Sequence, residues 1–558
     1  MLRIASSSGD FMDRPAGLPH FRYLKSPILS APRIIAIFPV GLLIPIWVII
    51  CYGWPISFWS SHDDYSYLAL AHALSLESSL RDGLVYPDAG LIDHPGLPYY
   101  VVSWICLRIA ALFAGAADAV SYGLNDADGF YLATRVAAGL ITTATVCACW
   151  RLLAPLAAPW RLLAIGAFFA ASPQSFYYGL TVLGNETFAL PLAALLFWAV
   201  GRLGRAPLEG GGIWLLLGAV AAVGYLVKPL YLNLLCAVAV LAIVHAGYAA
   251  TWLKTSWAIG IARRGALAGA AFVGTMLFAL LPLIGRTGLR NLLAFHFNIV
   301  THTQRYGTGD PGFVSLSAVD DAATTLLQTS ALPYLVVSAV LLLIGTIAAR
   351  RIAGTFDRAV VLWSAAALTG LGIAMAIVLK HYAPYYITAV SAMLPFVVAP
   401  VLGHRRLRWL AAGAIGFGLF VTVPLTHEFF SELSAARLTA AEDEAAIEAM
   451  PLQSGEARLW TYRVPSRWFA EAFVAQYSGV PRLSRSLANP QRQDFSSYSR
   501  VDRPYRYVVL DRSYYPDLNA VREAAKSLEP TQGFMVRMEK GDRLLLLKTM
   551  IVVERTTP

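Results

Sequence analysis

Eleven long apolar stretches constrain this chain more than any other feature of its sequence. A helix needs about 20 mostly apolar residues to cross a hydrocarbon core about 30 Å thick. The whole chain is 57% apolar and only 14% charged, a composition typical of polytopic membrane proteins. We therefore predict an α-helical membrane protein with about 11 spans. The stretches lie at 34–54, 131–150, 162–180, 187–201, 211–227, 229–247, 266–285, 331–348, 359–379, 385–402 and 409–426.

Basic residues indicate how these spans are oriented. Every second connection is basic, which the positive-inside rule assigns to cytoplasmic loops. The basic N-terminal segment 1–33 precedes a span without a small-residue cleavage pattern, so we predict an uncleaved cytoplasmic anchor. The net charge of +10 is explained by these loops, and no nucleic-acid partner is predicted. The basic connections contain Arg151 and Arg161; Arg202 and Arg205; Lys254, Arg263 and Arg264; Arg350, Arg351 and Arg358; and Arg405, Arg406 and Arg408.

A further apolar segment, 96–116, tests this orientation. If it crossed the membrane, the basic loops would lie outside while the basic N-terminus stayed inside, which the positive-inside rule disfavours. We therefore expect this segment to lie at the outer interface or to dip into the membrane without crossing. Arg108 in its middle fits that assignment.

The last part of the chain is polar, and short strand-like and helix-like patterns replace the long apolar stretches there. We predict three regions: a cytoplasmic segment 1–33, a membrane domain 34–427 with a first outer loop at 55–130, and a small extracytoplasmic α/β domain at 428–558. The expected location is a bacterial inner membrane, with this last domain in the periplasm. Within it the sequence predicts an acidic helix from Ala435 to Met450, strands beginning at Arg458 and Arg506, helices near 466–477 and 518–529, and a hairpin turn at 539–542.

Polar motifs gather on the predicted outer side of the membrane. Five separate connections contribute them, which a purely structural bundle does not require and which an active site at the outer interface does. Ionisable residues at a membrane boundary are costly, so they indicate function. The motifs are His62-Asp63-Asp64, Asp93-His94-Pro95, Asn185-Glu186-Thr187, Lys228-Pro229, the loop 286–330, and Lys380-His381-Tyr382.

The order of these motifs resembles that of a known family. The run from Asp63 to Ala71 is similar to the acidic pair, aromatic and alanine pattern in the first outer loop of type C glycosyltransferases, and 93–100 resembles a later His-Pro segment of that loop. Arg135, Glu186, Lys228-Pro229 and the segment 380–385 also have counterparts in order. The resemblance covers about 34–402, and the branch with protein O-mannosyltransferases and aminoarabinose transferases is the most similar. Gly96 departs from the pattern, because the family has a second proline there.

The resemblance implies an inverting enzyme that moves a monosaccharide from a polyprenyl-phosphate donor to a lipid, polysaccharide or protein acceptor. It implies that Asp63 is the base that takes the proton of the acceptor hydroxyl. Asp64 orients Asp63 or helps it to hold a divalent metal, Mg or Mn, through oxygen ligands. Such a reaction also needs cations for the phosphate leaving group, and Arg135, Lys228 and Lys380 are the candidates.

Each candidate also has a structural interpretation. The acidic pair at 63–64 would mark only the start of a loop. Asp93 and His94 are predicted to bind substrate, with His94 in contact with the donor or the acceptor, but they would otherwise be a turn that starts a helix before a proline. The lysines and Arg135 would extend their charges toward the interface. Glu186 and His381 are predicted to support substrate binding, whereas Tyr382, Tyr385 and Tyr386 are first of all interfacial aromatics and second sugar-stacking residues.

Three other classes of membrane protein compete with this interpretation. A transporter of a lipid-linked or small anionic substrate would place its charges near the midplane and often has inverted repeats, but the charges here lie at one boundary and no repeat is detectable. A ligase that transfers whole glycans would concentrate functional residues in a late outer loop. A membrane scaffold would leave the acidic pair and the Lys-His-Tyr motif unexplained.

Overall fold

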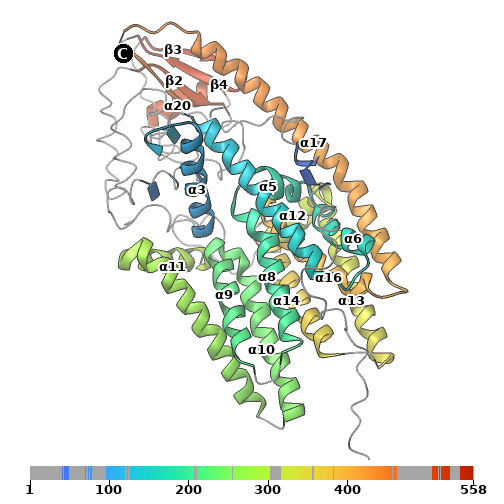
Figure 1. The fold of residues 1–558 in the computed structure, drawn as a ribbon. Helices are drawn as coiled ribbons and strands as arrows, with labels where there is room; N and C mark the ends of the chain where they lie inside the picture. The colour runs from blue at the N-terminus through green and yellow to red at the C-terminus, as the bar shows by residue number, and fades with distance from the viewer. Residues whose placement is uncertain are drawn as a thin grey trace, which may run out of the picture.

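The computed structural model describes residues 96–460, 505–527 and 541–556, and a few positions between 41 and 77. The first two of these ranges contain gaps, and the longest gap is 302–315. Among these residues, eight helices are long and apolar enough to cross a membrane, and three shorter apolar helices accompany them. The predicted polytopic helical fold is therefore confirmed. Figure 1 shows these helices as one elongated bundle, with the C-terminal sheet at one end.

Most of the main helices coincide with or contain a predicted apolar stretch. Large aliphatic and aromatic side chains from nearly all of them form one continuous buried core. Their bounds are α3 Leu97–Phe113, α5 Ala127–Leu152, α6 Ala158–Phe169, α8 Ala189–Leu203, α9 Gly212–Val227, α10 Leu232–Leu253, α11 Trp257–Thr301, α12 Leu316–Thr329, α13 Leu332–Ile352, α14 Arg358–Lys380, α16 Leu394–Leu402 and α17 Arg408–Glu448.

The stretch predicted as one span at 162–180 is broken, which corrects that prediction. Helix α6 ends at Phe169, and Ser172 then starts the short helix α7 (Pro173–Phe176) by accepting a hydrogen bond from the Gln174 amide. Pro173 lacks the amide that a continuous helix would need. A π-helical turn, η2 (Tyr177–Thr181), follows directly. The break brings the chain to the polar motif at 185–187.

The basic connections lie together at one end of the bundle. The Arg358 guanidinium donates to the carbonyls of Gly204 and Ala206, at 2.8 and 2.7 Å, and so joins the start of α14 to the end of α8. The rings of Trp160 and Trp409 meet edge to face at 5.0 Å, which joins the starts of α6 and α17. Because the helices alternate in direction, the loops at 170–188, 228–231 and 380–386 lie at the opposite end.

Helix α3 covers most of the segment expected at the outer interface. It has 17 residues, fewer than the roughly 20 that a full crossing requires. Its central Arg108 is paired: the Nε atom lies 2.5 Å from the Glu77 carboxylate, which also accepts from the Trp104 indole at 2.7 Å. Glu77 is buried, and the sequence pattern did not single it out.

Helix α17 links the membrane bundle to the C-terminal sheet. Its 41 residues extend about 60 Å at 1.5 Å per residue, and Figure 1 shows it running from the bundle to the sheet. The apolar stretch 409–426 and the acidic helix expected from Ala435 are therefore one helix, not two. The domain boundary expected at 427/428 falls inside it.

Four strands form the C-terminal sheet, in the order β1-β2-β4-β3. They are β1 Ala457–Trp460, β2 Tyr505–Asp511, β3 Arg543–Leu546 and β4 Met550–Glu554. Strand β1 is parallel to β2, and the other neighbours are antiparallel. The turn between β3 and β4 lies at 547–549. Of the turn expected at 539–542, only Gly541 and Asp542 lie within the described residues, directly before β3.

Alternating residues of β2 and β4 pack on two different helices. Tyr507, Val509, Met550 and Val552 pack on Ala440 and Ile447 of α17. The intervening residues pack on helix α20 (Leu518–Ser527). Strand side chains alternate between the two faces of a sheet, so the sheet lies between α17 and α20.

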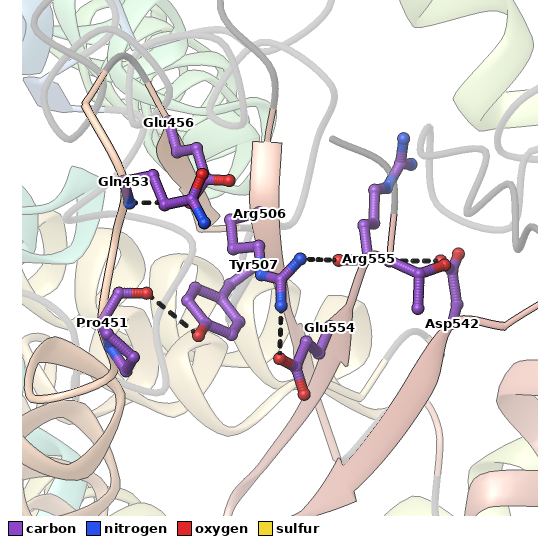
Figure 2. Close-up of polar contacts among 9 residues, drawn as sticks. Pro451, Gln453, Glu456, Arg506, Tyr507, Asp542, Glu554 and Arg555 are labelled. Atoms are coloured by element: carbon purple, nitrogen blue, oxygen red, sulfur yellow. Dashed lines mark hydrogen bonds and ion pairs between the residues drawn. The ribbon is translucent and has the colours of Figure 1, made fainter.

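Polar contacts join β2 to the end of β4 and to the segment after α17. The Arg506 guanidinium donates to the Glu554 carboxylate at 2.8 Å and to the Arg555 carbonyl at 2.6 Å, and the Tyr507 hydroxyl donates to the Pro451 carbonyl at 3.1 Å. Figure 2 shows these bonds side by side. The Tyr507 bond ties the sheet to the segment that follows α17.

Candidate active site

Lys228 is buried and directly follows α9, which ends there because of the proline after it. A proline disfavours helical geometry in the preceding residue, and Lys228 has extended backbone angles of −166° and 141°. Helix α9 therefore ends at Val227, and a short 3-10 turn, η4 (Pro229–Tyr231), begins. The lysine side chain is only 5% exposed. A buried ammonium needs a partner, since an isolated charge away from water is very costly.

Glu186 is that partner, and its position comes from a tight turn. Residues Asn185–Phe188 form the 3-10 turn η3, directly before α8. The Thr187 hydroxyl accepts from the Gly184 amide at 3.0 Å and lies 2.9 Å from the Val182 carbonyl. These bonds fold the chain back after the π-helical turn, and Glu186 is buried within the bundle.

The two residues form a buried ion pair. Lys228 Nζ lies 2.7 Å from Glu186 Oε1, and the glutamate side chain has no exposed surface. The turns around the pair are joined as well, since the Tyr231 hydroxyl donates to the Asn185 carbonyl at 3.2 Å. Removing one member of such a pair leaves an uncompensated charge, so the two residues depend on each other.

Two tyrosines of the late outer segment complete this cluster. The Lys228 ammonium lies 4.2 Å from the ring centroid of Tyr385 and 4.5 Å from that of Tyr386. Both rings belong to the 3-10 turn η6 (Pro384–Tyr386) that precedes α15 (Ile387–Ser391). A cation over the face of an aromatic ring is attracted by the ring quadrupole, more strongly where water is excluded. The sequence predicts both rings, like Tyr382, as interfacial aromatics first and sugar-stacking residues second, but it does not predict their contact with Lys228.

Gly96 brings the start of α3 against the same turn. A Cβ atom at this position would lie 2.9 Å from the Asn185 Oδ1 atom and 3.0 Å from the Tyr100 ring. Neither an alanine nor a proline would fit without a shift. The departure from the family pattern at Gly96 is thus explained by close packing on Asn185, a residue that neighbours Glu186.

The remaining predicted site residues divide into two groups. Arg135 is buried on α5, with its guanidinium 5.7 Å from the Tyr131 ring centroid, Lys380 is the last residue of α14, and Tyr382 is half-buried against the core. The structure therefore brings together Glu186, Lys228 and the segment after Lys380. Asp63, Asp64, Asp93, His94 and His381 lie outside the described residues, so the structure tests neither the acidic pair nor the His-Pro motif.

The metal expected at Asp63 and Asp64 is not tested either, because both residues lie outside the description. Within the described part of the chain, no three His, Cys, Asp or Glu side chains form a group that could hold a metal ion.

The fold is similar to those of solved membrane enzymes. The crystal structure of ArnT from Cupriavidus metallidurans bound to undecaprenyl phosphate matches with a TM-score of 0.51 and 13% identity, over 94% of this chain and 98% of that one. Archaeal oligosaccharyltransferase AglB from Archaeoglobus fulgidus, in complex with an inhibitory peptide and a dolichol-phosphate, has a TM-score of 0.45 and 10% identity, over 86% and 70% of the two chains.

Neither a family model nor a curated protein matches the sequence. The likeness to ArnT covers almost the full length of both chains, so it includes the C-terminal domain as well as the bundle. The chain thus has the fold of the type C glycosyltransferases. That fold agrees with the one that the outer motifs predicted.

Proposed function

We propose that this protein is a glycosyltransferase that moves a monosaccharide from a polyprenyl-phosphate donor to an acceptor outside the cytoplasm. The acceptor would be a lipid, a polysaccharide or a protein. The buried cluster of Lys228, Glu186, Tyr385 and Tyr386 carries this proposal, because it places a cation at the end of the bundle opposite the basic loops. A purely structural bundle does not need a charge pair at that depth.

The proposed reaction exchanges one bond at the anomeric carbon for another. The acceptor hydroxyl attacks that carbon, Asp63 takes the hydroxyl proton, and the bond to the phosphate oxygen breaks with its electron pair left on the phosphate. Attack opposite the leaving group inverts the configuration. Lys228 neutralises the charge on the departing phosphate, with Arg135 and Lys380 as further cations. Glu186 is a weaker candidate base than Asp63, since its carboxylate already accepts a hydrogen bond from the Lys228 ammonium at 2.7 Å.

Orientation is part of the proposal. The basic loops lie in the cytoplasm, with the N-terminus there too, and the C-terminal sheet lies in the periplasm. A reporter fused at the C-terminus should then be active only outside, and a cysteine placed between Arg405 and Arg408 should resist a membrane-impermeant reagent. Labelling of that cysteine from outside would reverse the assignment.

The function is tested by incubating the purified protein with a radiolabelled polyprenyl-phosphate sugar and fractionated lipid, polysaccharide and protein acceptors. Label should move to one fraction. Asp63→Asn keeps the shape of the side chain but not its ability to accept a proton, so transfer should fall about 10²- to 10⁴-fold. Chelation should have a similar effect if Asp63 and Asp64 hold Mg or Mn. Movement of unaltered donor across sealed vesicles, without transfer of label, would instead support the transporter.

A further inference from the structure

Three side chains of the protein surround the Lys228 ammonium. Glu186 lies at 2.7 Å, and the two ring centroids lie at 4.2 and 4.5 Å. The rings themselves are braced, because Tyr385 and Tyr386 meet edge to face at 4.8 Å and Tyr178 meets Tyr385 at 6.3 Å. Tyr178 comes from the π-helical turn η2, so the 3-10 turn η6 is held against the segment that leads to Glu186.

We propose that these four residues form an electrostatic latch that favours release of the polyprenyl phosphate product. Resting on the proposed function, this assigns Tyr385 and Tyr386 as positioning residues for the Lys228 ammonium. It also assigns Glu186 as a built-in anion that competes with the lipid phosphate for that ammonium. The rings hold the cation in place, while Glu186 limits how strongly the cation retains an anion.

The charge of the ligand changes during the reaction, which makes such a competitor useful. The donor is a phosphodiester with one negative charge. When the sugar leaves, the remaining phosphate monoester has a second ionisation with a pKa near 6, so it carries about −1.5 to −2 at pH 7. A fixed carboxylate beside the binding cation therefore repels the product more than it repels the donor. Without it, the more highly charged product would be held more tightly than the substrate.

The Lys228 ammonium donates to the Glu186 carboxylate at 2.7 Å. A phosphate oxygen competes with that carboxylate for the same donor, while the two aromatic rings stay beside the cation. Full separation of the lysine from both the carboxylate and the rings is not required, and exchange at one donor suffices.

The experiment compares variants that should move the product affinity in opposite directions. Glu186→Gln keeps an acceptor oxygen for the lysine but removes the negative charge. Polyprenyl phosphate should then inhibit transfer about tenfold more strongly, with a smaller fall in the KM for the donor and a lower kcat if product release limits the rate. Tyr385→Leu and Tyr386→Leu should weaken inhibition by the same compound, roughly three- to thirtyfold. The corresponding Phe variants should retain more affinity for polyprenyl phosphate than the Leu variants, because they keep the ring face.

Two matched controls separate this effect from general damage. Tyr334→Leu removes an exposed tyrosine of α13 that meets Phe417 at 6.1 Å, and Glu442→Gln neutralises an exposed glutamate on α17. Neither should change inhibition by polyprenyl phosphate. Binding of that compound, measured by its effect on thermal unfolding, gives a readout that does not depend on turnover and also reports variants that fail to fold.

The outcomes distinguish the latch from the function. If the natural protein transfers sugar but Glu186→Gln leaves product inhibition unchanged or weaker, the latch is wrong and the glycosyltransferase stands. If Leu and Phe variants lose affinity equally, the hydroxyls and not the ring faces act, and the assignment of the rings fails. If the natural protein neither transfers sugar nor binds polyprenyl phosphate, the proposed function itself fails.

Discussion

Two lysine–glutamate pairs in this protein have almost the same geometry and very different surroundings. In the bundle, Lys228 Nζ lies 2.7 Å from Glu186, and the side chains are 5% and 0% exposed. At the junction of α17 with the sheet, Lys548 Nζ lies 2.5 Å from Glu442, and the side chains are 66% and 63% exposed. Distance alone would rank them as equal.

Burial decides what each pair contributes. Water and salt screen the exposed pair, and holding two long side chains in one arrangement costs entropy. Inside the bundle both charges have lost their hydration, so each is stable only in the presence of the other. The buried pair is therefore poorly suited to add stability, yet strongly sensitive to the loss of one partner. This is the behaviour expected of an ion pair in a functional site, and not of one that only stabilises the fold.

The largest effect should come from breaking the buried pair on one side. Lys228→Met leaves the Glu186 carboxylate without its cation and should lower the free energy of unfolding by about 3–5 kcal/mol. The double variant with Glu186→Met should recover most of that loss, because neither charge remains. Denaturant unfolding in detergent micelles, followed by tryptophan fluorescence, measures both. Equal loss in the single and double variants would show that packing, and not the charge, is what matters.

A smaller effect is expected where α17 meets the sheet. The buried Asp443 carboxylate accepts from the Lys548 and Thr549 amides, at 3.3 and 2.6 Å, and from the Thr549 hydroxyl at 2.8 Å. Hydrogen bonds to a charged group contribute about 1.5–3 kcal/mol. Asp443→Ala should therefore reduce hydrogen-exchange protection of β4 about ten- to a hundredfold and leave the amides of α8 and α14 unchanged. Equal loss of protection in bundle and sheet would mean that the two unfold as one unit.

These contacts also show what the sequence could predict. Apolar length and basic loops predicted the helices and their alternation, because both follow from properties of single segments. Lys228 and Glu186 were each predicted as site residues, but their pairing was not, since 42 positions separate them and only the packing of α8 beside α9 joins them. The Ser172-Pro173 start signal was present within 162–180, and the apolar run concealed it.

Gly96, Tyr385 and Tyr386 show a second limit of prediction from the sequence. The sequence alone does not explain why a glycine replaces a proline at position 96, whereas the position of Asn185 explains it. Tyr385 and Tyr386 resemble any interfacial aromatics in the sequence, and only the distance to the Lys228 ammonium separates them from Tyr382. Contacts of this kind depend on where two distant turns meet, which no local pattern records.

The smallest effect is expected from the exposed pair. The hydrogen bond with Glu442 raises the pKa of Lys548 above its ordinary value of 10.5. A raised pKa of a basic group means that its contribution is present below the unfolded pKa and is lost as the pH rises through the folded pKa, so the relevant window begins above about 10.5. Between pH 6 and 9 the contribution is fully present but small, because the pair is exposed and screened. Lys548→Gln should therefore leave the Tm and its pH dependence nearly unchanged in this range, and so should high salt. A clear fall in Tm at pH 7 would show that exposure does not weaken this pair, and the contrast with Lys228 would then lose its physical basis.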